Sequence, residues 1–137
     1  MIAAAIVFGA PTYMGSASAP FKTFMDATSD FWEEQRWADK IAGGFTVGTA
    51  ASGDKLSTLT QFAILAAQHG MVWVGQQELG GVVDPAAAEI NAAGFNLGLA
   101  ATSSRDKTVL IDPGDAETAR RYGARIAMAA RRWGTLS

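Results

Sequence analysis

The sequence predicts an α/β domain built on an open parallel sheet that is covered by helices. An uncharged apolar run occupies residues 2–8, strand-like and helix-like segments alternate as far as residue 74, and charged residues make up only 18% of the chain. Strands of a parallel sheet are buried on both faces, so their sequences are continuously apolar instead of alternating with polar residues. The order strand, helix, strand, helix, strand predicts parallel pairing through right-handed crossovers.

The composition predicts one domain that binds neither nucleic acid nor membrane. At 137 residues the chain has the length of an ordinary domain, so we treat residues 1–137 as a single domain. The net charge of −2 provides no basic field for nucleic acid or an anionic membrane. The apolar run is too short to span a bilayer and has no basic leading segment, so we expect no secretory signal.

Cysteine is absent and histidine occurs once. The chain therefore offers no disulfide, no thiolate nucleophile and no metal site of the Cys or His type. The lack of cysteine fits a reducing compartment, and we expect a cytoplasmic protein.

The first strand and helix are expected within residues 2–34. Residues 2–8 form a central strand, and residues 9–17 form the loop that follows it. Ser18 is a favourable N-cap residue, and Pro20 falls in the first helical turn, where its missing N–H costs little. Apolar residues then recur at helical spacing, which predicts a helix over residues 19–34.

The second strand is expected over residues 40–49 and is followed by a loop over residues 49–54. A helix then runs to about Gln68. Gly70 lies just past that helix, where glycine is common. Residues 71–74 form a short third strand.

The following segment is irregular. Residues 76–83 form a glycine-containing loop, Asp84 and Pro85 cap a short helical turn that reaches about Asn91, and a short strand is expected around residues 97–101. A long loop inside a small domain usually serves a site or an interface.

The last helix begins at Asp112 and Pro113, with acidic residues in its first turn and arginines near its end, as the helix dipole favours. The arginine pairs at 120–121 and 131–132 are expected on a solvated face. The predicted buried stripe of this last helix consists of small or apolar residues: Ala116, Ala119, Gly123, Ile126, Ala127 and Ala130.

Two loops carry the chemistry, namely residues 10–18 and 49–54. The chain contains neither the Gly-x-Gly-x-x-Gly motif nor the P-loop motif, and a Ser/His/Asp arrangement would have to include His69. The two loops follow neighbouring strands, so they meet at one edge of the sheet and form a slot with backbone donors, hydroxyls and a tyrosine. A flat ligand with polar edges fits such a slot.

The residues in and around these loops resemble a known family, the WrbA-type flavodoxin-like NAD(P)H:quinone oxidoreductases and FMN reductases. The resemblance to that family's first flavin loop and following helix rests on Phe8-Gly-Ala-Pro-Thr-Tyr-Met-Gly-Ser16, Ser18, Phe24-Met25-Asp26 and Phe31-Trp32. Thr49-Ala-Ala-Ser-Gly-Asp54 and His69-Gly-Met-Val72 resemble the second flavin loop and the strand beyond it. The resemblance covers roughly residues 5–75 well and the last helix only loosely.

The resemblance implies roles for these residues. One edge and face of the flavin ring is contacted by Pro11, Thr12, Tyr13, Met14 and Gly15, and the other side by Thr49, Ala50, Ser52 and Gly53. His69 stands where the family has a histidine near the ring, which makes it the candidate catalytic residue. Trp32 resembles an aromatic residue that closes the site of a neighbouring subunit. The implied chemistry is hydride transfer from NAD(P)H to FMN and then to a quinone.

The chain matches the family from the third strand onward. The resemblance therefore implies an N-terminally truncated, three-layer flavodoxin-like sheet, with strands equivalent to the family's third, fourth and fifth and its C-terminal helix. The phosphate-binding loop has no counterpart, and Tyr13 stands where some members carry a basic residue. We therefore expect FMN binding to be weak or absent.

The strand at residues 2–8 also lacks its preceding neighbour, and an uncharged open edge favours pairing with another chain. We expect a homo-oligomer that forms through this edge. One alternative function is a non-catalytic oligomerisation module or remnant that has lost flavin binding. A second alternative is a small-ligand binder that uses the slot without flavin.

Overall fold

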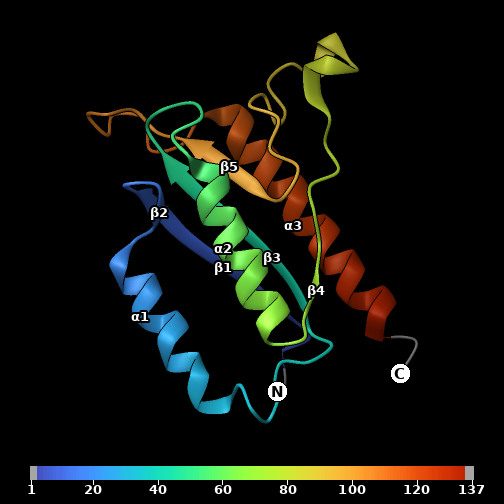
Figure 1. Cartoon of the computed structure of the whole chain (residues 1–137). Helices are drawn as coiled ribbons and strands as arrows, with labels where there is room; N and C mark the ends of the chain where they lie inside the picture. The colour runs from blue at the N-terminus through green and yellow to red at the C-terminus, as the bar shows by residue number, and fades with distance from the viewer. Residues whose placement is uncertain (1–2, 135–137) are drawn as a thin grey trace.

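The computed structural model describes residues 3–134 and shows a three-layer α/β arrangement (Figure 1). Four parallel strands form the sheet, and a two-residue strand pairs antiparallel to the first of them. The strands are β1 (Ala5–Tyr13), β2 (Ser16–Ala17), β3 (Ile41–Gly48), β4 (Val72–Trp73) and β5 (Leu99–Thr102). The open, mostly parallel sheet confirms the predicted fold class.

Helices cover the two faces of the sheet unequally. Helices α1 (Ala19–Ala27) and α2 (Lys55–Gln68) lie on one face, where Phe8, Leu59 and Phe62 form a core. Helix α3 (Pro113–Gly134) lies on the other face (Figure 1) and packs through Tyr122 and Ile126. The α1/α2 face therefore holds the larger aromatic core.

The first strand differs from its prediction at both ends. Ile2 lies outside the described residues, and β1 runs on to Tyr13, through positions that were expected to form a loop. Met14 and Gly15 form a two-residue hairpin turn with φ of 48° and 82°, which returns the chain into β2. A turn with positive φ at both residues matches the twist of the paired strands, so the hairpin extends β1.

The first helix is shorter than expected. α1 ends at Ala27, and the 3₁₀ helix η1 (Thr28–Phe31) follows, so the predicted continuation to residue 34 is wrong. Beyond η1 the indole of Trp32 donates to the carbonyl of Gln68, and Gln35 takes a φ of 48°. These contacts turn the segment toward the end of α2. Ser18 caps α1 through its carbonyl, which accepts from Phe21 and Lys22, and not through its hydroxyl.

The third strand predicted over residues 71–74 is β4, and the short strand expected around residues 97–101 is β5. Both lie on the same side of β3. β4 pairs with the beginning of β3, where Ile41 lies opposite Val72. β5 pairs with the end of β3, where Phe45 lies opposite Leu99. Between them the chain leaves the sheet and forms two short 3₁₀ helices, η2 (Gly80–Val82) and η3 (Pro85–Ala87). Asp84 caps η3, as expected, by accepting from the amide of Ala86.

Helix α3 buries a different stripe from the predicted one. Its buried residues are Gly114, Thr118, Tyr122 and Ile126. Of the predicted stripe only Ile126 is buried. The polar side chains of Thr118 and Tyr122 are buried in place of the predicted alanines, because both form hydrogen bonds inside the fold. The Tyr122 hydroxyl donates to the carbonyl of Val74 at 2.6 Å and accepts from the amide of Gly44 at 3.3 Å.

Among the described residues no helix is long and apolar enough to cross a membrane. The described residues also hold no group of three or more His, Cys, Asp or Glu that could bind a metal ion.

Candidate functional site

The two candidate loops follow the ends of β1 and β3. These strands are parallel and paired, with Pro11 opposite Val47, so the loops leave the sheet side by side at its carboxyl edge. The structure therefore places the two sets of predicted flavin contacts, Pro11 to Gly15 and Thr49 to Gly53, at the same edge of the sheet. This edge is where open α/β sheets bind their ligands.

A cluster of three threonine hydroxyls supports the loops from below. The Thr12 Oγ1 atom lies 2.7 Å from Thr46 Oγ1 and 2.8 Å from Thr58 Oγ1. Thr46 and Thr58 are buried, so their hydroxyls depend on these internal hydrogen bonds. The cluster joins the end of β1 to β3 and α2 and fixes where the first loop begins. Sequence reasoning missed Thr46 and Thr58, although hydroxyls in otherwise apolar strand and helix positions were the available signal.

The first loop presents large side chains to solvent. Tyr13 is 66% exposed and Met14 is fully exposed. The strand beyond the turn is held in place by α2, because the Gln61 side-chain oxygen accepts from the amide of Ala17 at 2.8 Å. A rigid turn thus carries an aromatic and a thioether side chain, which are suited to contact the face of a flat ligand.

The second loop is exposed from Thr49 to Asp54 and ends in two residues with positive φ, Gly53 at 53° and Asp54 at 55°. The amide of Lys55 donates to the carbonyl of Ser52 at 3.0 Å, which closes the loop onto the first turn of α2.

Lys55 supports this loop from inside the protein. Its side chain is fully buried, and its ammonium donates to Thr102 Oγ1 at 3.0 Å and to the Ala51 carbonyl at 3.4 Å. Burial lowers the pKa of Lys55, and nearby Asp115 opposes that shift. Burial likewise raises the pKa of Asp115, whose carboxylate accepts from the amide of Thr102 at 2.8 Å. Lys55 therefore ties the second loop to the end of β5 and the start of α3.

A cavity of about 1070 Å³ opens beside the second loop. Thr49, Ala50 and Ala51 line it together with residues 102–105 and 112–115. Of the predicted ligand-binding residues, only Thr49 and Ala50 line this cavity, while Ser52, Gly53 and the first loop lie outside its wall.

The structure places His69 at the other end of α2 from both loops. Helix α2 has 14 residues and is therefore about 21 Å long. His69 is buried between Phe31 and Trp37, whose ring centroids lie 5.7 and 4.7 Å away. Within one copy of the chain, His69 cannot touch a ligand bound at the loops.

The hydrogen bonds of His69 define its tautomer. Its Nε2 atom lies 2.8 Å from Thr28 Oγ1, and the Thr28 hydroxyl donates its own proton to the carbonyl of Met25. Nε2 must therefore carry the proton, which leaves Nδ1 as a buried acceptor with no partner among the described residues. Burial also lowers the pKa of His69, so the ring is neutral at pH 7.

Trp32 lies beside His69. Both residues line a second cavity of about 460 Å³ at the end of α2, together with Thr28 and Asp26. The structure thus divides the predicted site residues into two groups, the loops at one end of α2 and the Trp32/His69 pair at the other.

Comparisons with known proteins cover both groups. The model of a family described as NADPH-dependent FMN reductase matches residues 1–81. The flavodoxin FldP of Pseudomonas aeruginosa (strain UCBPP-PA14) is 42% identical over 127 residues, which cover 91% of this chain and 69% of that protein. The quinone-oxidoreductase QR2 of Triphysaria versicolor is 41% identical over 70 residues, which cover 50% of this chain and 34% of that protein.

The sheet has a counterpart in a solved structure. The flavodoxin, WrbA-like protein from Agrobacterium tumefaciens superposes with a TM-score of 0.72 and 40% sequence identity, over 94% of this chain and 67% of that one. The family match includes both loops, α2 and β4, and it ends before β5 and α3.

Proposed function

The chain belongs to the NADPH-dependent FMN reductase family and has a flavodoxin-like fold, and we propose that it is a flavin-dependent NAD(P)H:quinone oxidoreductase. The observation that carries this proposal is the placement of the two loops side by side at the carboxyl edge of the sheet. A bound flavin supplies a ring that accepts hydride from a nicotinamide and passes it to a quinone. The protein's part is to hold that ring and to exclude water from it.

The residues of the loops fit a flavin ring better than a phosphate. The predicted contacts are Pro11, Thr12, Tyr13, Met14, Gly15, Thr49, Ala50, Ser52 and Gly53, and none of them is basic. Tyr13 and Met14 offer exposed apolar surface, while the threonine cluster and the buried Lys55 side chain fix the loops beneath it. Since charge-assisted hydrogen bonds are the strongest contacts to a phosphate, loops without them select for the ring. We therefore expect FMN to bind these loops weakly, with little advantage over riboflavin.

His69 and Trp32 belong to the proposed site only through a second copy of the chain. Both line the cavity at the far end of α2, and the Nδ1 atom of His69 is a buried acceptor with no partner among the described residues. We propose that this end of one copy closes the loops of another, where Trp32 covers the ring and neutral His69 lies buried close behind it.

The open edge of β1 is the proposed route of assembly. On the side away from β3, the one pairing of β1 within residues 3–134 is with β2, at Thr12 and Tyr13. Self-pairing of the remaining edge across a two-fold axis gives the homo-oligomer that the site requires. We place this oxidoreductase in the cytoplasm, which its lack of cysteine supports.

Riboflavin titration of two matched glycine variants tests the role of the loops. Gly15 and Gly94 both have positive φ, at 82° and 72°, and an added side chain meets nothing within 4 Å at either position. Valine therefore introduces similar backbone strain at both sites, but only Gly15 lies in a proposed flavin loop. We expect Gly15→Val to raise the riboflavin Kd about tenfold, which corresponds to about 1.4 kcal/mol, and Gly94→Val to leave it unchanged.

FMN serves as the second ligand in the same titration. Equal Kd values for FMN and riboflavin support recognition of the ring alone. Equal effects of the two valine variants, or no binding of either flavin at micromolar concentration, contradict the proposed flavin site.

The second candidate function is a non-catalytic oligomerisation module, and one observation favours it. Val7 and Phe45 are each 46% exposed on the adjacent strands β1 and β3, where they line an apolar groove of about 480 Å³ beside Tyr122 and Ile126. Strands of this kind are normally covered on both faces, so this surface suits an interface. An oligomer that binds no flavin would favour this candidate.

A further inference from the structure

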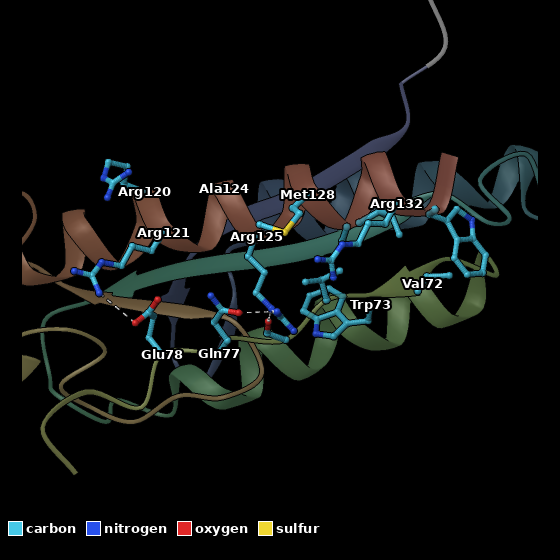
Figure 2. A pocket seen from close by; sticks show the side chains of 15 residues that line it. Val72, Trp73, Gln77, Glu78, Arg120, Arg121, Ala124, Arg125, Met128 and Arg132 are labelled. Carbon is cyan, nitrogen blue, oxygen red and sulfur yellow. Dashed lines mark hydrogen bonds and ion pairs between the residues drawn. The ribbon is translucent and has the colours of Figure 1, made fainter. Parts of the chain in front are cut away.

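A groove lined with arginines runs between α3 and the edge of the sheet at β4, away from the two loops (Figure 2). It encloses about 580 Å³, which is within the usual range for small-molecule sites. Arg121, Arg125 and Arg132 reach it from one face of α3, while Glu78 is the only carboxylate that the residues described in the structure contribute to its wall. This local excess of positive charge occurs on a chain whose net charge is −2. The sequence predicted a solvated face for Arg121 and Arg132, and it gave no role to Arg125.

Arg125 is held in position by neutral acceptors. Its Nε donates to the carbonyl of Gly75 at 2.9 Å, and its Nη1 donates to the Gln77 side-chain oxygen at 2.8 Å. Figure 2 shows this side chain reaching from α3 across the groove to the strand edge. Two of five N–H groups are used in this way, so the guanidinium keeps donors for a ligand while its rotamer is fixed. The positive charge of Arg125 is not neutralised by either of these partners.

Arg121 differs from Arg125 in its partners. It donates to Glu78 at 3.3 Å and to Glu117 at 3.0 Å, and these carboxylates offset its charge. The anionic group of a ligand is therefore expected to contact Arg125 in preference to Arg121.

The other end of the groove combines apolar side chains with Arg132. Val72, Met128 and Trp133 line it, and Trp133 is 45% exposed. Helix α3 rises about 12 Å between Arg125 and Trp133, so a ligand with a charged head and a flat body can contact both residues. An indole and a thioether are suitable surfaces for an aromatic ring.

We propose that this groove is a second ligand site, which binds an organic phosphate that carries an aromatic base, of the nucleoside monophosphate class. Arg125 contacts the phosphate, and Trp133 and Met128 contact the base. The site is separate from the loops and does not depend on the proposed flavin chemistry.

Titration with adenosine 5′-monophosphate, inorganic phosphate and adenosine, followed by amide chemical shifts, tests the proposal. We expect the monophosphate to bind at least about tenfold more tightly than either fragment, with shifts confined to residues 72–78 and 120–133. Arg125→Gln should weaken it about 10- to 100-fold, as loss of charge-assisted hydrogen bonds predicts. Arg36→Gln is the matched control, because Arg36 is an exposed arginine outside the groove, paired with Glu34. It should leave the affinity unchanged.

Several outcomes overturn the proposal: no binding at millimolar concentration, equal binding of inorganic phosphate, shifts centred on the loops at residues 11–15 and 49–53, or an equal effect of Arg36→Gln. If Arg125→Gln alters the fold by circular dichroism, Arg121→Gln provides the second variant. We expect a smaller loss of affinity from Arg121→Gln, since Glu78 and Glu117 already offset its charge.

Discussion

His69 is the residue whose predicted and observed surroundings differ most. The sequence placed it near a flavin ring, whereas within one copy it lies under Trp37 and donates to Thr28. The sequence could not show this, because Phe31 comes from a segment expected to continue a helix and Trp37 from the segment after it, to which no element was assigned.

The burial of His69 predicts a pH dependence of stability. Its pKa is lowered from 6.5 by burial, so the unfolded chain binds this proton at a higher pH than the folded chain does. The free energy of unfolding should therefore fall as the pH drops from about 6.5 through the lowered folded pKa. Urea unfolding at a series of pH values checks this, with His69→Gln as the variant that should lose the dependence.

Nitrogen-15 shifts of the imidazole provide the direct measurement. We expect a neutral ring at pH 7 with the proton on Nε2. A proton on Nδ1, or a folded pKa at or above 6.5, would contradict the hydrogen-bond assignment.

At the same scale, the residues that support the loops are largely polar and were not predicted. Thr46, Thr58 and Lys55 are buried because partners distant in the sequence satisfy them. A periodic pattern of apolar residues identifies only side chains that are buried because they are hydrophobic. It therefore misses buried polar side chains, whose hydrogen-bond partners lie elsewhere in the sequence. The exposed loops themselves could be predicted, because glycine, proline and small polar residues mark turns locally.

Among the elements, α2, β3, β4 and β5 follow the prediction within one or two residues, since each has a local apolar pattern and a terminating glycine or polar loop. The errors have long-range causes. β1 is extended by its pairing with β2, and α1 is cut short by contacts with the end of α2.

The packing of α3 depends on Tyr122, and this gives a prediction with a matched control. Tyr122→Phe removes a buried hydroxyl that donates to the carbonyl of Val74 and accepts from the amide of Gly44. This change should lower the free energy of unfolding by about 1–3 kcal/mol. Tyr13 is the other tyrosine of the chain and is 66% exposed, so Tyr13→Phe should change stability by less than about 0.5 kcal/mol. Urea unfolding measures both variants. Equal effects would show that the hydroxyl of Tyr122 does not anchor α3.

At the scale of the whole molecule, Val7 belongs both to the open β1 edge of the sheet and to an incompletely covered face. A lysine at this position is unfavourable in an apolar interface between strands. Val7→Lys should therefore shift the protein toward smaller species in light scattering. Val82→Lys makes the same change at a side chain that is 94% exposed in η2, and it should leave the size unchanged.

Hydrogen exchange locates the same interface. Slow exchange at Val7, whose amide faces away from β3, supports pairing of this edge in the native protein. A monodisperse monomer with fast exchange at Val7 would contradict it, and would leave the Trp32/His69 end of the molecule without a partner site.

The proposed function requires that the protein use a flavin to pass electrons from NAD(P)H to a quinone. The direct measurement is anaerobic reduction of flavin by NADPH in the presence of the protein, followed through flavin absorbance, and then addition of a quinone. We expect the flavin to be bleached faster with the protein than at the same concentration free in solution, and the colour to return stoichiometrically with the quinone. Bleaching no faster than that of free flavin would contradict the claim.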